Sequence, residues 1–397
     1  MSKIIAVNSG SSSLKFQLFQ MPEEKVLTSG SAERIGIDNG IFTINVNGEK
    51  FVTNVDIPDH QKAVDLLLEK LIEHKIVENL NEIDAAGHRI VQGGSYFNQS
   101  VKVDEDVVKK VDELACIAPL HNPAHLVCYE AFKKALPDIG HVFVFDTAFH
   151  QTMEPDSYLF PVPYEWYTDY KVRKYGAHGT SHEYVMKRTA ELMNKKPEDL
   201  NIITCHLGNG ASITAIKKGK CINTSMGLSP LGGIMMGTRC GDIDPTVVYY
   251  MAEKLKCSPE EMDNYLNKKS GMLGVSGISS DSRDIQKAAD EGNPRAILTQ
   301  DLYVNRIINL IGGYYMQLGH IDAMSFTAGL GEHATTIRKM ILKALEEGMG
   351  LKIDYELNSK THSEQKISYD DSKVAVYVVP TNEELVIARD TTRILGL

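Results

Sequence analysis

A strand–turn–strand unit opens the chain and recurs near its middle. Residues 4–7 form an apolar run typical of a buried strand, residues 8–13 form a polar turn, and apolar and polar side chains alternate over residues 14–18 as in a second strand. Residues 202–216 repeat this order of strand, turn and strand. A chain that contains such a unit twice is expected to form a duplicated α/β fold with a cleft between the two copies.

Helices and a strand that ends in a polar loop follow each copy of the unit. We expect residues 143–149 of the first half to correspond to residues 325–332 of the second half. Prolines and aromatic residues just after residue 150 indicate a break there. We therefore predict one domain over residues 1–150 plus 385–397, and a second domain over residues 151–384.

The turn before Lys15 combines hydroxyl groups, a glycine and a lysine, a composition that suits a bound phosphate. It is not a Walker A loop, because no glycine precedes Lys15 and no Ser or Thr follows it. The residues after it also alternate as a strand, whereas a Walker A loop must open a helix. Taken alone, the stretch is equally compatible with an ordinary polar hairpin turn.

Length and composition exclude several classes of protein. The 397 residues suggest about two domains, and 43% hydrophobic with 24% charged residues is typical of a globular protein. The net charge of −10 and the lack of a basic run argue against a nucleic-acid surface. The six cysteines show no CxxC spacing, so we expect reduced thiols without zinc or disulfides. Without a signal peptide or an 18-residue apolar segment, we expect a cytoplasmic protein that does not bind membranes.

Two arginines lie beside glycines or at a strand end. Arg89 ends a predicted buried strand, and Arg239 lies in the run Gly237-Thr-Arg-Cys-Gly-Asp242. The planar guanidinium group can bind carboxylate or phosphate oxygens with two parallel hydrogen bonds. A surface ion pair is the alternative for each arginine considered alone.

Histidines and an aspartate occupy similar positions. His178 and His206 adjoin glycines at the ends of predicted elements, where a side chain can face a ligand. We expect His182, at a helix start, to be an ordinary hydrogen-bonded residue. Asp146 follows a short apolar strand directly, so it is a candidate for holding a metal or orienting a nucleophile, or else a turn residue.

Two glycine- or polar-rich loops are weaker candidates. Residues 329–332, Gly-Leu-Gly-Glu, lie between a predicted strand and helix, where the backbone can approach a nucleotide phosphate or base. Residues 281–283, Asp-Ser-Arg, form another polar loop.

Eight motifs, collinear over essentially the whole chain, resemble those of the acetate kinase family. They are Val7-Asn-Ser-Gly-Ser-Ser-Ser-Leu-Lys15, Gly87-His-Arg-Ile-Val91, Ala118-Pro-Leu-His-Asn-Pro123, Phe145-Asp-Thr-Ala-Phe-His150, His178-Gly-Thr-Ser-His182, His206-Leu-Gly-Asn-Gly210, Gly237-Thr-Arg-Cys-Gly-Asp242 and Thr381-Asn-Glu-Glu384. The resemblance implies two ribonuclease-H-like domains, as in the superfamily of acetate and sugar kinases, heat-shock chaperones and actin. It also implies a homodimer whose second domain carries the nucleotide and the dimer contact.

The resemblance implies roles for the candidate catalytic residues. Arg89 would hold the carboxylate substrate, and Asp146 would be the active-site carboxylate. His178 and Arg239 would stabilise the transferring phosphoryl group. The small apolar pocket for the methyl group would be lined by Val91, Leu120 and Pro230.

The resemblance also implies a metal and a nucleotide site. Asn8 and Glu383 would be associated with Mg²⁺ (or Mn²⁺), and Lys15 would contact ATP. The residues that would surround the ATP or ADP are His206, Leu207, Gly208, Asn209, Gly210, Asp281, Ser282, Arg283, Gly329, Leu330, Gly331, Glu332 and His333.

The implied reaction is reversible transfer of the γ-phosphoryl group of ATP to acetate. Such a transfer needs alignment and positive charge around the phosphoryl oxygens, which the arginines, His178 and Mg²⁺ can supply. Acetate is already ionised at pH 7, so Asp146 is expected to organise the metal or its waters rather than act as a general base. The alternatives are a propionate or butyrate kinase and, from another class, a non-catalytic nucleotide-switched binding protein.

The sequence departs from the family pattern at four positions. Ala177 stands where the family has phenylalanine, and the absent ring beside a methyl-sized pocket suggests that longer acids can also enter. Gln92 replaces a histidine, and His125 and His333 each replace an asparagine. Val91 is retained, which favours acetate.

Overall fold

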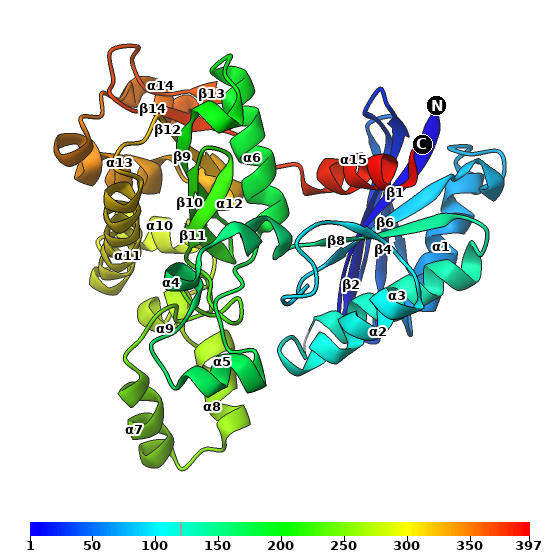
Figure 1. Ribbon diagram of the computed structural model, residues 1–397, viewed down its shortest axis with the longest axis horizontal. Coiled ribbons are helices and arrows are strands. Elements are labelled where there is room, and N and C mark those ends of the chain that lie inside the picture. The colour runs from blue at the N-terminus through cyan, green and yellow to red at the C-terminus, as the bar shows by residue number, and fades with distance from the viewer. Residues whose placement is uncertain (120) are drawn as a thin grey trace. The chain divides into compact units, whose positions relative to one another are not determined.

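The chain forms two compact units in the computed structural model, which describes residues 1–119 and 121–397. The first unit is built from Met1–Ala148 together with Asn382–Leu397, so the C-terminal segment returns to the N-terminal unit. The second unit is Phe149–Thr381. In Figure 1 the first unit runs from blue to cyan and takes in the red C-terminal helix.

The first unit is built on an eight-stranded sheet with the order β5-β4-β3-β2-β1-β6-β8-β7. Its strands are β1 (Ser2–Gly10), β2 (Ser13–Met21), β3 (Lys25–Glu33), β4 (Ile41–Val46), β5 (Glu49–Asn54), β6 (Ala85–Ile90), β7 (Val101–Lys102) and β8 (Gly140–Phe145). The first five strands form an antiparallel meander, as the glycine-punctuated sequence predicts, and β1, β6 and β8 run parallel.

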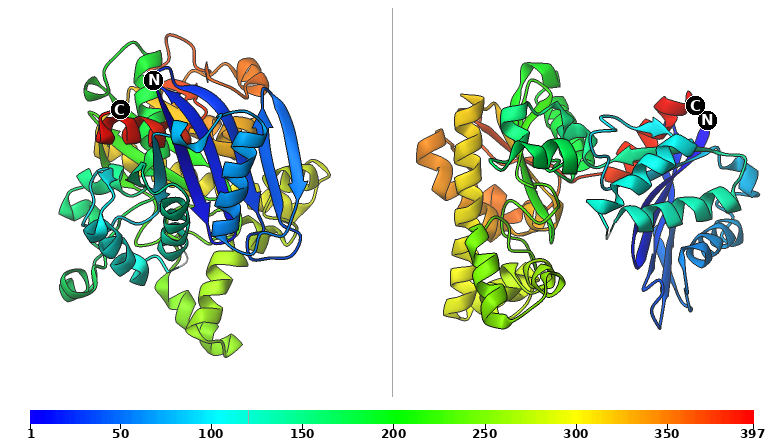
Figure 2. Two further views of the ribbon diagram at one scale, coloured as in Figure 1. Left: turned by 90° about the vertical axis from the view of Figure 1, so that its right-hand side faces the viewer. Right: turned by 60° about the horizontal axis from the view of Figure 1, so that its bottom comes forward.

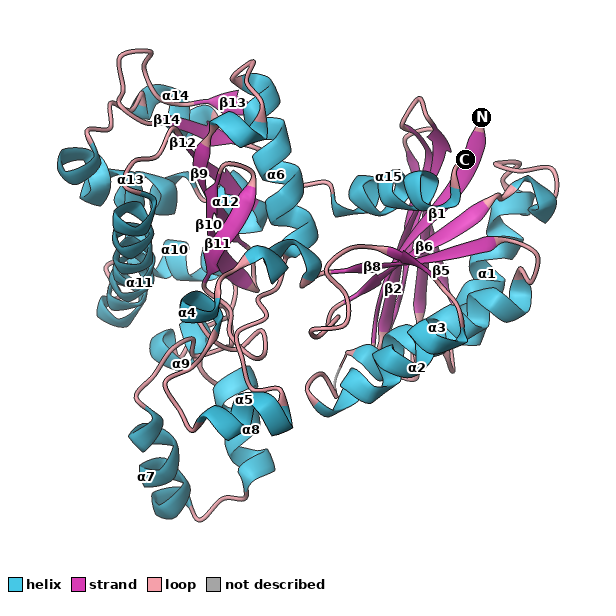
Figure 3. Cartoon of the chain, in the orientation of Figure 1, coloured by secondary structure: helices cyan, strands magenta, loops and turns pink. Residues whose placement is uncertain are grey.

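Helices cover both faces of this sheet (Figure 3). One face packs on α1 (His60–Glu73) and α3 (Asn122–Ala135), with α2 (Glu105–Glu113) beside α3. This face is apolar because alternate residues of β1 and β2, such as Val7 and Phe16, enter one buried cluster. The opposite face carries α15 (Glu383–Leu395), and Gly87 of β6 allows its close approach, since a β-carbon there would lie 2.5 Å from Ile387 Cγ2.

The second unit is built on a six-stranded sheet with the order β11-β10-β9-β12-β14-β13. Its strands are β9 (Asn201–Leu207), β10 (Ala211–Lys217), β11 (Lys220–Thr224), β12 (Ala323–Thr327), β13 (Gln365–Lys366) and β14 (Ala375–Val378). Strand β9 is buried along its whole length, as expected of a strand covered on both faces.

The helices of the second unit lie on both faces of its sheet and beyond it. They are α4 (Pro155–Tyr158), α5 (Tyr164–Tyr170), α6 (Gly179–Leu192), α7 (Pro245–Leu255), α8 (Pro259–Lys268), α9 (Gly271–Ser276), α10 (Ser282–Asp290), α11 (Pro294–Leu318), α12 (Ala328–His333), α13 (Thr335–Met349) and α14 (Tyr355–Lys360). Helix α6 packs on one face of β9 and α11 on the other, whereas α7 and α8 extend away from the sheet (Figure 2). Short 3₁₀ turns occur at Leu80–Glu82, Leu114–Cys116, Ala148–Thr152 and Pro197–Asp199.

The two sheets share one topology, which confirms the predicted duplicated α/β fold. In each, a three-stranded antiparallel meander is followed by two parallel strands: β3-β2-β1-β6-β8 in the first unit and β11-β10-β9-β12-β14 in the second. The strand at 325–327 is therefore the counterpart of β6 and not of β8, whose counterpart is β14. The predicted correspondence of residues 143–149 with 325–332 was wrong, because β8 is the second parallel strand added to the meander of its unit, whereas β12 is the first.

Two local predictions were also wrong. The first hairpin turn spans only residues 11–12, because Asn8 and Gly10 still pair with β2 as part of β1. The run Thr180-Ser-His-Glu183 predicts a capping box that opens a helix, but the N-cap of α6 is His178, which has a left-handed backbone (φ 60°) and makes no side-chain capping bond. Pairing across the hairpin and packing around His178 override these local turn and cap signals.

Candidate active site

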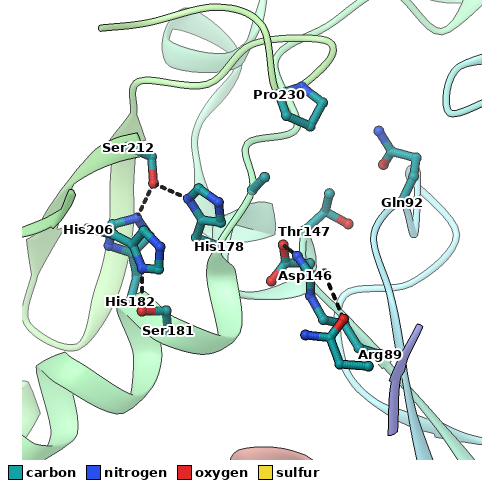
Figure 4. Close-up of polar contacts among 12 residues, drawn as sticks. Arg89, Gln92, Asp146, Thr147, His178, Ser181, His182, His206, Ser212 and Pro230 are labelled. Carbon is teal, nitrogen blue, oxygen red and sulfur yellow. Dashed lines mark hydrogen bonds and ion pairs between the residues drawn. The ribbon is translucent and has the colours of Figure 1, made fainter. Parts of the chain in front are cut away.

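In the first unit, Arg89 at the end of β6 is fixed by two neighbours (Figure 4). Its Nη2 donates to Asp146 Oδ2 at 2.7 Å, and its Nη1 donates to Asn8 Oδ1 at 3.2 Å. The Asp146 side chain is fully buried, and that of Arg89 is 17% exposed. Arg89 lies near the end of β6, Asp146 directly follows β8, and Asn8 lies in β1. These three strands are neighbours in the sheet and run parallel, so the carboxyl ends of the strands bring the three side chains together.

The charge on Arg89 is stabilised by carboxylates of its own unit. Burial by itself would lower the pKa of Arg89, but Asp146 and Glu383 raise that pKa above its ordinary value. The pKa of Glu384 is raised in turn, first by its burial and then by the charge of Glu383. Arg89 therefore stays charged as a fixed donor for an anion.

Asn8 and Lys15 lie directly opposite each other across the first hairpin. Directly paired residues of antiparallel strands point to the same face, here the face away from the apolar core that contains Val7, Leu14 and Phe16. The Lys15 side chain is exposed and can move toward a ligand. The alternation of apolar and polar residues over 14–18 predicts that Lys15 points away from the core, and the strand pairing confirms this direction.

The oxygen atoms around Arg89 fit a hard divalent cation. Asn8 supplies an amide oxygen, and Asp146 and Glu383 supply carboxylates, which are the ligand types that Mg²⁺ takes beside substrate phosphates and water. Over residues 1–119 and 121–397, no group of three or more His, Cys, Asp or Glu side chains forms a ready-made metal cage.

The loop after β6 is held by buried polar contacts. Val91 and Gln92 are buried, and Gln92 Oε1 accepts a hydrogen bond from the Gly94 N–H at 2.9 Å. Thr147 Oγ1 accepts from the Gly93 N–H at 3.0 Å. The glutamine that replaces the family histidine therefore closes this loop. Leu120, the other predicted pocket residue of this region, lies outside the described residues.

His125 lies beside the first hairpin. Its Nδ1 is 3.3 Å from Ser9 Oγ, and its buried Nε2 has no hydrogen-bond partner within the described chain. Burial, and after it the nearby charge of Arg89, lower the pKa of His125 to about 3. This histidine is therefore neutral at physiological pH.

In the second unit, four histidine and serine side chains meet between α6 and the sheet (Figure 4). His178 Nδ1 is 2.8 Å from Ser212 Oγ, which in turn is 2.7 Å from His182 Nε2. The rings of His178 and His206 stack with centroids 4.1 Å apart. His182 is fully buried and hydrogen-bonded at both ring nitrogens, which confirms the prediction that it is a hydrogen-bonded residue.

Arg239 and His178 approach the same glycine. A β-carbon at Gly210 would lie 3.3 Å from Arg239 Nη1 and 3.5 Å from His178 Nε2. Arg239 Nη1 also donates to the Pro230 carbonyl at 3.2 Å, and burial lowers the pKa of Arg239. The second hairpin turn, His178 and Arg239 therefore form one cluster of donors.

The turn after β12 abuts the second hairpin. Ala328 has a left-handed backbone (φ 64°), which is strained for a residue other than glycine, and its Cβ lies 3.6 Å from a β-carbon placed on Gly208. The fully buried Arg338 holds this turn by donating to the carbonyls of Gly331 and Glu332 at 2.9 and 2.7 Å. The rigid backbone of residues 328–333 is thus available to a ligand.

A cavity of about 480 Å³ adjoins this turn. Its lining includes Ser282, Arg283, Gln286, Lys287 and His333, from α10, α12 and the start of α13. Arg283 holds the pKa of Asp281 down at about 2 by hydrogen bonding, so Asp281 is ionised at neutral pH and caps α10. Of the predicted segments 281–283 and 329–333, Ser282, Arg283 and His333 line this cavity.

Ala177 does not border open space within its own unit. It is only 3% exposed and belongs to the main apolar cluster of the second unit. Its carbonyl accepts a hydrogen bond from His150 Nε2 at 3.1 Å.

Sequence analysis missed several residues that support these clusters. Ser212, Thr204 and Arg338 carry no motif signal of their own. Along β9 and β10, the alternation of polar with apolar residues places Thr204, His206 and Ser212 on one face of the sheet. This alternation is the sequence pattern from which Thr204 and Ser212 could have been predicted, whereas Arg338 lies on α13 and has no such pattern.

Comparison with known proteins gives one consistent result. The model of the acetokinase family matches residues 3–389. The chain is 54% identical over 397 residues to an acetate kinase of Geobacillus kaustophilus, covering 100% of both chains. It is 52% identical over 394 residues to an acetate kinase of Bacillus subtilis, covering 99% of this chain and 100% of that one.

Solved structures agree with the sequence relatives. An acetate kinase of Porphyromonas gingivalis is similar with a TM-score of 0.95 and 43% identity, covering 100% of both chains. A propionate kinase of Francisella tularensis is similar with a TM-score of 0.93 and 39% identity, covering 99% of this chain and 100% of that one. By its full-length match to the family model and to these relatives, the chain belongs to the acetokinase family.

Proposed function

We propose that this kinase reversibly transfers the γ-phosphoryl group of ATP to acetate, giving acetyl phosphate and ADP. The observation that carries the proposal is the full-length match to relatives that bear the name acetate kinase. Membership of this family already makes the chain a kinase with a carboxylate acceptor. The residues below are those that we assign to the reaction.

Arg89 binds the carboxylate of acetate in this proposal. Its guanidinium is oriented by Asp146 and Asn8, and its charge is stabilised by the neighbouring carboxylates. Val91, Pro230 and Leu120 take the methyl group. Acetate is ionised at neutral pH, so its oxygen attacks the γ-phosphorus without losing a proton, and the role of Asp146 is to hold Arg89 and the metal waters in place.

His178 and Arg239 stabilise the phosphoryl group as it moves. Both approach Gly210, where the second hairpin presents backbone N–H groups, so charge developing on the phosphoryl oxygens meets donors that are already in place. Residues 206–210, 281–283 and 329–333 bind the nucleotide, with the base in the 480 Å³ cavity beside His333. Lys15 contacts the phosphates.

Asn8 and Glu383 would hold Mg²⁺ (or Mn²⁺). When bound, the ion would neutralise charge on the ATP phosphates. Asn8 also accepts from Arg89, and Glu383 begins α15, so both side chains are positioned by the strand and helix ends that surround Arg89.

The test is formation of acetyl hydroxamate from ATP, acetate and hydroxylamine. The proposal predicts product in proportion to enzyme and to acetate. Nucleotide binding or hydrolysis without hydroxamate would refute it and would favour a non-catalytic nucleotide-switched protein. The propionate kinase among the similar structures and the alanine at position 177 make propionate or butyrate kinase the second candidate.

We further propose a cytoplasmic homodimer. Large side chains lie exposed on α5, α7 and α11 of the second unit, among them Tyr170 (69%), Tyr249 (76%) and Met316 (76%), and aromatic and methionine side chains are enriched at protein interfaces. Among the described residues, no helix combines the length and apolarity needed to cross a membrane. Light scattering after gel filtration would give twice the 44.0 kDa chain mass for a dimer.

A further inference from the structure

A chain of three buried polar side chains leads from the sheet of the second unit to the partly exposed His178. It runs from Thr204 on β9 to His182 on α6, then to Ser212 on β10, and ends at His178. The contacts are Thr204 Oγ1 to His182 Nδ1 at 2.6 Å, His182 Nε2 to Ser212 Oγ at 2.7 Å, and Ser212 Oγ to His178 Nδ1 at 2.8 Å. Thr204, His182 and Ser212 are all fully buried.

Hydrogen-bond chemistry allows two directions along this chain. A neutral histidine has one donor nitrogen and one acceptor nitrogen, and a hydroxyl can donate only one proton. If Thr204 donates to His182, then His182 donates to Ser212, and Ser212 can donate its own proton to His178 Nδ1. The proton of His178 is then on Nε2, the atom that approaches Gly210 beside Arg239. The opposite direction turns the Nε2 lone pair toward that point.

We propose that Thr204, His182 and Ser212 are positioning residues that hold His178 as the Nε2–H tautomer, with that N–H directed at the phosphoryl oxygens. The proposal rests on the role given to His178 under the proposed function. A lone pair at Nε2 would repel those oxygens, whereas an N–H donates to them, so the direction of the chain decides whether His178 stabilises the transfer.

Two further contacts limit the movement of His178. Its ring stacks on His206, which is itself held by Ser181 Oγ at 2.7 Å from Nδ1. His150 Nε2 donates to the carbonyl of Ala177, the preceding residue, at 3.1 Å. His206, Ser181 and His150 therefore fix the ring plane and the backbone of His178, whereas the relay from Thr204 sets its tautomer.

The test replaces relay residues that do not touch substrate. Thr204→Val keeps the shape of the side chain and removes the donor to His182, and Ser212→Ala removes the link to His178. We expect kcat to fall about 10-fold for Thr204→Val and about 100-fold for Ser212→Ala, the range typical of groups that orient a functional histidine. The KM values for ATP and acetate should stay within about twofold, because only the transition-state contact is lost.

The matched control is Thr214→Val. Thr214 is also fully buried, faces Thr204 across the β9–β10 pair, and bonds to Thr224 Oγ1 at 2.8 Å instead of to a histidine. It should leave kcat unchanged. In protein labelled with ¹⁵N-histidine, the Nδ1 resonance of His178, assigned by its loss in His178→Gln, should be that of an unprotonated acceptor nitrogen in the wild type and should change in Thr204→Val.

His178→Gln separates the two levels of the proposal. If it keeps wild-type kcat, the assignment of His178 to the phosphoryl group is refuted, and the relay with it. If His178→Gln loses activity while Thr204→Val and Ser212→Ala do not, the relay alone is refuted. Adding Thr204→Val to His178→Gln should not lower kcat further. A further 10-fold loss of kcat would mean that Thr204 acts through stability or through another part of the protein and not through His178.

Discussion

Replacing Asp146 by asparagine removes one charge from the pair with Arg89 while keeping the shape of the side chain. Removing one partner of a buried ion pair costs about 3–5 kcal/mol of unfolding free energy. Arg89 keeps 17% exposure and its bond to Asn8, and the asparagine oxygen can still accept, so we expect a smaller loss of about 1–3 kcal/mol. Because the carboxylate charge that we assign to holding Arg89 and the metal waters is lost, kcat should fall at least about 100-fold, or about 2.7 kcal/mol of activation free energy.

The measurements are urea unfolding followed by circular dichroism and hydroxamate formation at saturating ATP and acetate. The control is Glu364→Gln, which removes the partner of another doubly bonded arginine, Arg188, at 2.6 and 2.7 Å. Both side chains of that pair are about one-third exposed, so its loss should lower the free energy of unfolding by less than about 1 kcal/mol and leave kcat unchanged. A variant Asp146→Asn with near wild-type kcat and unchanged dependence on Mg²⁺ would refute the organising role of Asp146.

Three other substitutions test separate parts of the account. Glu384 has a raised pKa in the folded protein, so its ionisation opposes folding, and Glu384→Gln should stabilise the protein at pH 7. Urea unfolding at a series of pH values should show that this gain in unfolding free energy vanishes below the ordinary glutamate pKa of about 4.3. A β-carbon at Gly237 would lie 1.8 Å from Asn209 Oδ1, so Gly237→Ala should raise the KM for ATP, with partial recovery in Gly237→Ala/Asn209→Ala. The control is Gly312→Ala on α11, where a β-carbon would meet no atom within 4 Å. It should raise the free energy of unfolding by about 0.5–1 kcal/mol. Ala177→Phe inserts a ring into a packed cluster and should cost about 1–3 kcal/mol while lowering kcat/KM for propionate more than for acetate.

The sheets were the most predictable part of the fold. Period-two alternation and buried apolar runs predict both hairpins, and the duplicated topology confirms them. The extent of the first turn was not predictable from its polar residues, because strand pairing extends through Asn8 to Gly10. The start of α6 was missed because a histidine with a left-handed backbone, not a Ser or Thr, precedes its first turn.

The site was predictable where a motif places a residue at a strand end. Arg89 and Asp146 end or follow adjacent parallel strands, and they are in direct contact. The relay from Thr204 to His178 was not predictable in this way, because its successive members lie 22, 30 and 34 positions apart, on a helix and two strands. Those contacts depend on how α6 packs on the sheet, which no local pattern encodes.

The central claim is that this acetokinase-family enzyme uses acetate as its preferred acceptor. The direct measurement is kcat/KM for acetate, propionate and butyrate with ATP and Mg²⁺, by hydroxamate formation under one set of conditions. The account predicts the highest value for acetate, with propionate lower by about 10-fold or more, since one methylene group contributes about 1–3 kcal/mol of discrimination. An equal or higher value for propionate would contradict it.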